Sequence, residues 1–146
     1  MSLEKNKVIV RRWFEATNKQ NLALLSELIA PDFYHHTTQS RGEDFKQYLT
    51  MLFKGFPDWH VTIEDIIAEG DKVWVHFEIT GTHIGEYRGL TPTGKKFTAT
   101  SVNIYRIVDG KVVEIWRVSD LLDFYKQLGV IEYTEKAKKL LPEIVP

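Results

Sequence analysis

The spacing of apolar residues changes between Phe53 and Trp59, and this change limits the fold of the 146-residue chain more than any other feature. Before it, apolar side chains recur every three or four residues, which is the spacing of one helix face. After it, β-branched and aromatic residues are enriched and partly alternate with polar ones, as in half-buried strands. Helices followed by a long antiparallel sheet predict an α+β domain with helices packed on one face of a curved sheet.

Three helices are expected in the first part of the chain, over Leu3–Thr17, Leu22–Ile29 and Glu43–Phe53. Either Asn18 or Asn21 is placed to cap the second helix, and Ala30-Pro31 ends it because the residue before proline is disfavoured in helical geometry. Between the second and third helices we expect a loop.

Four long strands are expected in the second part, over residues 59–67, 72–83, 97–108 and 111–121. Glycine and proline residues within 85–96 indicate a longer connection with room for a short extra strand. A short helix over Leu121–Leu128 is expected to stop at Gly129, and Thr134–Leu141 is expected to be a last helix or tail.

The dipeptide Asp109-Gly110 predicts a tight hairpin that pairs Val108 with Lys111. Counting back through an unbroken ladder places Tyr105 opposite Glu114, Asn103 opposite Trp116, Ser101 opposite Val118 and Ala99 opposite Asp120. Alternation along the strands then separates two faces. One is predicted to line a cavity and bears Asn103, Tyr105, Glu114, Trp116 and Asp120. The other bears Val102, Ile104, Arg106, Val113, Ile115 and Arg117, and its cover is expected to be a second copy of the chain.

Aromatic residues are numerous, with four Trp, six Tyr and eight Phe, so a ring-lined cavity closed by Trp13 and Phe14 is expected. Polar groups set among aromatic rings are typical of a pocket for a small molecule. The alternative is that the polar face of the sheet lies in solvent, although Trp116 and Tyr105 suit a wet face poorly.

Asp120 is the candidate catalytic group. It follows a predicted strand and lies beside Val118, Leu121 and Leu122, where burial would raise the pKa of the carboxyl toward that of a useful general base. The alternative interpretation is a structural one, in which Asp120 caps the helix that begins at Leu121.

Composition excludes several other classes of protein. A net charge of −1 provides no field to attract nucleic acid, and no apolar run is long enough for a membrane span, so we expect a cytoplasmic protein. No cysteine is present, and the spacing of the five histidines matches no metal motif, so neither a metal nor another cofactor is expected. His35 and His36 are adjacent, so in extended chain they point in opposite directions and at most one enters a cavity.

Several short motifs together resemble the SnoaL-like polyketide cyclases, also called ester cyclases, of the nuclear transport factor 2-like superfamily. They are residues 56–59 (FPDW), 68–73 (AEGDKV), 81–85 (GTHIG), 92–95 (PTGK), Tyr105-Arg106, 109–111 (DGK) and the run from Trp116 to Gly129. The resemblance extends through a core of residues 1–129 and leaves residues 130–146 as a C-terminal tail of one single-domain chain.

The resemblance implies a cone-shaped, cystatin-like fold with a deep pocket, and a cofactor-free intramolecular aldol closure of a polyketide ester. It also implies that Asp120 is the acid–base group, that Asn103 and Tyr105 hold the substrate, and that His35 or His36 supplies a histidine common in the family. Trp13 and Trp116 are further candidates for binding the substrate, as rings of the expected cavity. Two positions depart from the family, since Arg117 stands where an acidic residue is common and Val118 where a polar pocket residue can occur. A homodimer or homotetramer is expected.

Two other functions stay open at this point. One is a non-catalytic module that binds a small molecule, with Asp120 serving only as a ligand contact or a helix cap. The other is a lyase, isomerase or epoxide hydrolase, because one scaffold supports many reactions.

Overall fold

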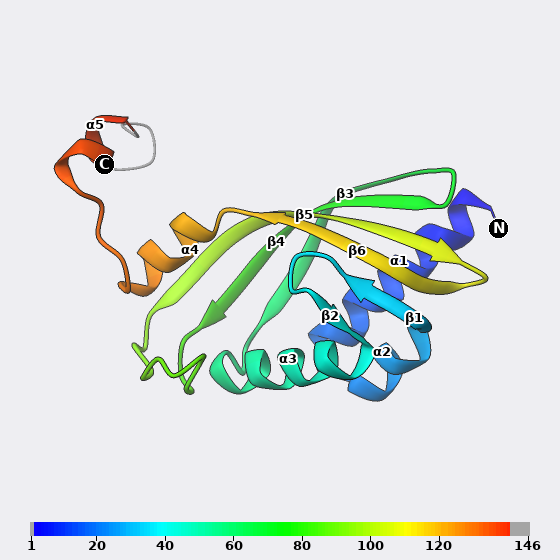
Figure 1. Cartoon of the computed structure of the whole chain (residues 1–146), viewed down its shortest axis with the longest axis horizontal. Coiled ribbons are helices and arrows are strands. Elements are labelled where there is room, and N and C mark those ends of the chain that lie inside the picture. Colours follow the sequence, from blue (N-terminus) through cyan, green and yellow to red (C-terminus); the bar gives the residue numbers. More distant parts are fainter. Residues whose placement is uncertain (1, 141–146) are drawn as a thin grey trace.

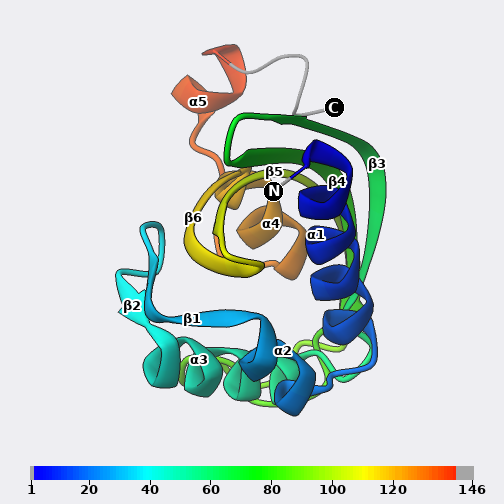
Figure 2. The same ribbon diagram turned by 90° about the vertical axis from the view of Figure 1, so that its right-hand side faces the viewer.

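The computed structural model describes residues 2–140 and has a curved six-stranded sheet with helices packed against its inner side (Figure 1). The strand order is β2-β1-β6-β5-β4-β3, and all neighbours are antiparallel except the parallel pair of β1 and β6. The view along the molecule shows the long strands curled, with α1 beside them and with β1, α2 and α3 below (Figure 2). The predicted α+β cone is confirmed.

The helices agree with the predicted ones to within two residues at most ends. They are α1 (Leu3–Asn18), α2 (Leu22–Leu28), α3 (Gly42–Gly55), α4 (Leu121–Leu128) and α5 (Glu135–Leu140). Asn21 caps α2 by accepting a hydrogen bond from the Leu24 amide, whereas Asn18 bonds the backbone of Val61 in β3. Among the described residues, no helix is both long and apolar enough to cross a bilayer.

The strands are β1 (Ile29–His35), β2 (Ser40–Arg41), β3 (His60–Glu69), β4 (Lys72–Thr82), β5 (Lys96–Val108) and β6 (Lys111–Ser119). The expectation of a loop after α2 is wrong, because β1 forms there and pairs with β6. Pro31 lies inside β1 where the register with β6 is irregular, so its missing amide proton costs the sheet little. The long connection before β5 has only an isolated bridge between Tyr87 and Leu90.

The hairpin of β5 and β6 begins as predicted and then departs from the predicted register. Val108 pairs with Lys111, but a bulge at the Arg106/Ile107 step pairs Arg106 with Glu114 and Asn103 with Arg117. Val113 is the extra residue of the bulge, so two successive residues of β6, Val112 and Val113, are both buried instead of alternating. The predicted faces of β6 are therefore wrong beyond the bulge, where each side chain lies on the opposite face.

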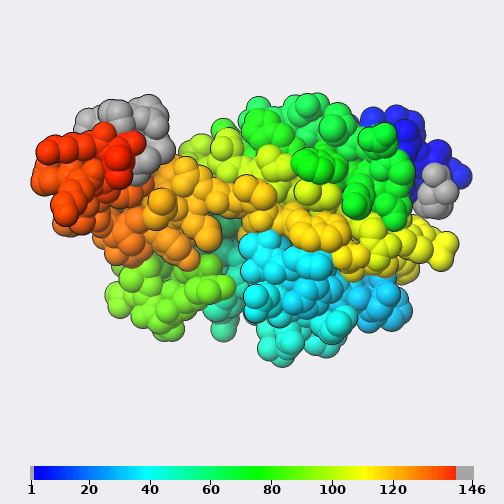
Figure 3. Space-filling model, turned by 45° about the horizontal axis from the view of Figure 1, so that its top comes forward, coloured from blue at the N-terminus to red at the C-terminus, as the bar shows by residue number. Residues whose placement is uncertain are grey.

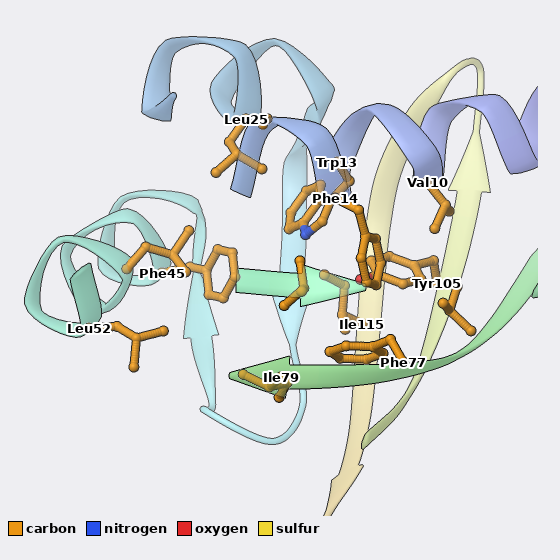
Figure 4. Packing of buried hydrophobic residues seen from close by; sticks show 14 of the residues in the cluster. Val10, Trp13, Phe14, Leu25, Phe45, Leu52, Phe77, Ile79, Tyr105 and Ile115 are labelled. Atoms are coloured by element: carbon orange, nitrogen blue, oxygen red, sulfur yellow. The ribbon is translucent and has the colours of Figure 1, made fainter. Parts of the chain in front are cut away.

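The core lies between the sheet and the helices, around rings from several elements (Figure 4). Trp13 in α1 contacts the rings of Phe33, Phe45 and Tyr105, with centroid distances of 6.2, 5.9 and 5.9 Å. Phe14 meets the Phe77 ring edge to face at 4.9 Å. Trp13 and Phe14 thus help to close the cup, as predicted.

The substitution Trp13→Ala is expected to destabilise the protein by about 3–5 kcal/mol, because it removes a buried indole that three rings contact. Only 5% of the Trp13 surface is exposed, so the ring is almost fully shielded from solvent and its removal leaves a cavity. Denaturant unfolding of the variant beside Val8→Ala, which alters an exposed residue of α1, provides the measurement. A loss below about 1 kcal/mol for Trp13→Ala would contradict this packing.

Candidate functional site

An inner cavity lies between α1, α3 and the concave face of the sheet, and seven of the fifteen residues that line it carry rings. Its volume is about 50 Å³, and the cavity is partly open to solvent. Figure 4 shows Trp13, Phe45, Phe77 and Tyr105 among the side chains around this region. The polar residues that also line the cavity are Thr17, His35, Asn103 and Arg117.

His35, at the end of β1, is fully buried and faces this cavity. Its Nδ1 accepts a hydrogen bond of 3.3 Å from the Thr38 amide, so the proton of the neutral ring is on Nε2. Burial, reinforced by the charge of Arg117, lowers the pKa of His35 to about 3. The buried Nε2 has no hydrogen-bond partner among the described residues. His35 therefore presents an unused N–H donor near neutral pH.

Asn103 and Tyr105, two residues apart on β5, both face the inner cavity, which confirms their predicted position. The Asn103 amide donates a 3.0 Å hydrogen bond to the Tyr105 hydroxyl, while Asn103 Oδ1 is buried and has no partner among the described residues. Burial raises the pKa of Tyr105 well above its ordinary value, so the phenol is neutral and its own proton is free to be donated. The pair thus offers one acceptor and one donor.

Arg117 and Ile115 line the cavity although the sequence prediction placed them on the opposite face, because the bulge in β6 reverses their direction. The Arg117 backbone is fixed by Thr37, whose hydroxyl accepts from the Arg117 amide at 2.9 Å and donates to the Arg117 carbonyl at 3.0 Å. The Nε atom is buried with no hydrogen-bond partner among residues 2–140. The tandem valines at 112 and 113 were the one signal that could have revealed the bulge.

Asp120 lines an outer cavity that shares Leu52, Trp59, Ile79 and Arg117 with the inner one. Aromatic residues line much of this outer space, namely Tyr48, Trp59, Tyr87, Phe97, Phe124 and Tyr125. The burial predicted for Asp120 is wrong, since the residue is exposed at the rim. Its Oδ1 accepts a 3.0 Å hydrogen bond from the Asp123 amide and so caps α4, as the structural interpretation requires.

His36, Glu114 and Trp116 lie outside both cavities, which corrects the predictions that placed Glu114 and Trp116 on the cavity face. The His36 ring stacks on Trp116 with a centroid distance of 4.5 Å, and its Nε2 is 2.7 Å from Glu114 Oε2. Glu114 also accepts a 2.6 Å hydrogen bond from Arg106. The hydrogen bond with His36 and the neighbouring guanidinium lower the pKa of Glu114. Only His35 of the histidine pair enters the cavity.

Metal ligands are not gathered at this site. Within the part of the chain that the structure describes, no group of three or more His, Asp or Glu side chains is arranged to hold a metal ion.

A curved sheet and helices that enclose a ring-lined cavity with a few polar groups define a pocket-bearing α+β domain of the cone-shaped kind. The profile of the SnoaL-like polyketide cyclases matches residues 7–128, so the chain belongs to this family of enzymes. Aklanonic acid methyl ester cyclase DauD of Streptomyces sp. (strain C5) is 33% identical over 129 residues, which cover 83% of this chain and 80% of the relative.

Two further relatives support this assignment. Aklanonic acid methyl ester cyclase DnrD of Streptomyces peucetius is 32% identical over 129 residues, which cover 83% of this chain and 88% of the relative. The solved structure of IdmH from Streptomyces antibioticus has a TM-score of 0.74 at 34% identity, and the match covers 86% of this chain and 99% of that one.

Proposed function

We propose that this chain catalyses a cofactor-free, intramolecular aldol-type ring closure of a small β-dicarbonyl compound, with Asp120 as the acid–base group. One observation carries the proposal: among the described residues, Asp120 is the one carboxylate that lines either of the two adjoining cavities. Two relatives that are named methyl ester cyclases support the reaction class.

The reaction needs one base that returns the proton it takes. The Asp120 carboxylate removes a proton from the carbon between two carbonyl groups, and the enolate that forms attacks an internal carbonyl carbon. A carbon–carbon bond forms while the electron pair of that carbonyl moves to its oxygen. Asp120 then returns the proton to the new alkoxide, so neither an oxidant nor a cofactor is consumed.

The helix cap and the catalytic role are compatible on one side chain. Capping uses Oδ1, and Oδ2 of Asp120 has no hydrogen bond with any described residue. The cap fixes the orientation of the carboxylate at the cavity rim, where Oδ2 is free to take a proton. Trp13, His35, Asn103 and Tyr105 are proposed to hold the substrate from the inner cavity.

Proton exchange tests the proposal without requiring ring closure. Wild-type protein is expected to accelerate the exchange of the activated C–H of a small β-keto ester in D₂O by about 10²-fold or more, followed by NMR. Ester binding without acceleration would favour a non-catalytic binding module over the enzyme.

The assembly is inferred to be a homodimer, or a homotetramer built from such dimers, through the outer face of the sheet. Ile67, Trp74, Ile104 and Trp116 lie opposite one another across β3 to β6, and 47% of Trp74 is exposed. The space-filling view shows the four long strands, green to yellow, forming a broad surface (Figure 3). Such an apolar row is typical of subunit contacts.

Sedimentation measures this assembly directly. A dimer is expected at micromolar concentration, and Trp74→Glu is expected to shift the protein toward monomer, because the substitution places a charge in the apolar row. Glu78→Gln is the control, since it alters another residue of β4 without adding charge. Monomeric wild-type protein would contradict the dimer. A cytoplasmic location, and a single domain with residues 1–129 as its core and 130–146 as a C-terminal helical tail, stay proposals, and residues 141–146 of that tail lie outside the described part of the chain.

A further inference from the structure

Arg117 brings a positive charge to the two cavities without a matching negative one. None of the ion pairs among residues 2–140 includes Arg117, so no described carboxylate lies within 4.0 Å of its guanidinium nitrogens. Of the described residues, no Asp or Glu lines the inner cavity, and only Asp120 lines the outer one. The guanidinium is therefore unpaired within the described part of the fold.

A cation in such surroundings is unfavourable unless another group compensates it. Guanidinium charges that leave water lose hydration, and they are normally found paired with carboxylates or phosphates. Arg106, on the outer face of the neighbouring strand, follows this rule because it bonds Glu114 at 2.6 Å and lies 3.7 Å from Asp71. Arg117 has no such partner in the part of the chain that the structure describes, which points to an anion supplied by a ligand.

Hydrogen-bond donors surround the same space. His35 contributes an unpartnered Nε2–H, Tyr105 a hydroxyl proton and Arg117 the Nε–H, and all three residues line the inner cavity. The charge of Arg117 reaches the other two, since it contributes to the lowering of the His35 pKa and opposes the rise of the Tyr105 pKa. Several donors and a cation against one acceptor, Asn103 Oδ1, favour a ligand rich in acceptor oxygens.

We propose that Arg117, assisted by His35, binds a free carboxylate of the substrate, which makes the substrate a keto acid rather than a fully esterified compound. This inference rests on the proposed function and names the substrate class for the same site. A planar guanidinium matches the two oxygens of a carboxylate, and charge-assisted hydrogen bonds are about twice as strong as neutral ones. The carboxylate anchors the substrate in the inner cavity and leaves its β-dicarbonyl part toward Asp120.

The spacing of the two residues limits the substrate further. Arg117 and Asp120 are three residues apart at the end of β6, so their Cα atoms are separated by at most about 10 Å. A single small molecule is therefore long enough to contact both residues. Thr37 keeps this spacing by bonding both backbone groups of Arg117.

Two matched probes made from 3-oxohexanedioic acid test the proposal. In the monomethyl ester, the carboxyl next to the β-keto group is esterified and the remote one is a free carboxylate. In the dimethyl ester, both are esterified. Calorimetry is expected to show the monoester binding wild-type protein at least about tenfold more tightly than the diester. Arg117→Gln is expected to reduce this preference to about twofold or less, because the amide keeps polarity but not charge. Arg117→Lys, which keeps the charge, is expected to retain part of it.

Arg106→Gln is the matched control and is expected to leave the preference unchanged, since Arg106 lies on the outer face. Equal binding of the two esters by wild-type protein, or an undiminished preference in Arg117→Gln, would overturn the carboxylate site. Proton exchange of the same probes separates this inference from the proposed function. A preference for the monoester without exchange would leave the carboxylate site standing and remove the catalytic role, whereas exchange without preference would do the reverse.

Discussion

Replacing Asp120 with asparagine is expected to reduce catalysed proton exchange by about 10²-fold or more while the protein stays folded. The amide has nearly the shape of the carboxylate, but it cannot accept the proton of the activated carbon. The helix cap survives, because asparagine caps about as well as aspartate and its oxygen can accept from the Asp123 amide. The free energy of unfolding is thus expected to change by less than about 0.5 kcal/mol.

The control for this variant is Asp123→Asn, which alters a carboxylate one turn away in α4. Asp123 Oδ2 accepts from Gln127 and lines neither cavity, so its replacement is expected to leave exchange unchanged. NMR in D₂O follows the exchange, and thermal unfolding checks the fold of both variants. An Asp120→Asn protein that exchanges the probe as fast as wild type would restrict Asp120 to capping.

Local features of the sequence account for most of the fold. Apolar spacing and capping residues predicted the helices, because helix contacts join residues three and four apart. The hairpin at Asp109-Gly110 was predicted for the same reason, since its geometry depends on two residues with positive φ, 52° and 76° in the structure. The β1 strand was missed because its partner β6 is about 80 residues away and Pro31 argues against a strand.

The candidate site was predicted only in part, and the β6 bulge separates the two parts. Asn103 and Tyr105 face the cavity as expected because the extra residue lies in β6 and leaves the alternation of β5 unbroken, whereas Trp116 and Arg117 exchange places. A single extra residue has this effect because side chains alternate with a period of two. Arg117 had looked like a surface residue, and only the three-dimensional register places its charge beside His35.

The stability of the protein is expected to fall steeply with acid because of His35. Its pKa is lowered from an ordinary value of 6.5 to about 3, first by burial and then by the charges of Arg117 and His36. Below pH 6.5 the unfolded chain binds a proton at this residue, while the native protein stays neutral there until about pH 3. Stability is therefore lost as pH falls through this window, by about 1.4 kcal/mol per pH unit, or roughly 3 kcal/mol by pH 4.5.

His35→Asn isolates this contribution, because the asparagine oxygen can take the place of Nδ1 and accept from the Thr38 amide without titrating. The variant is less stable at pH 7 than wild type, since the lost ring leaves space beside Phe45, so the informative quantity is the slope of stability against pH. Denaturant unfolding between pH 7 and pH 4.5 measures how the free energy of unfolding depends on pH. In His35→Asn this dependence is expected to be shallower by about one proton. The control His76→Asn alters an exposed histidine of β4 and is expected to keep the wild-type slope. Equal slopes in wild type and His35→Asn would mean that His35 accepts a proton inside the fold. In that case His35 would be a charged imidazolium at mildly acidic pH. The site would then no longer have a neutral Nε2–H donor beside Arg117 under those conditions.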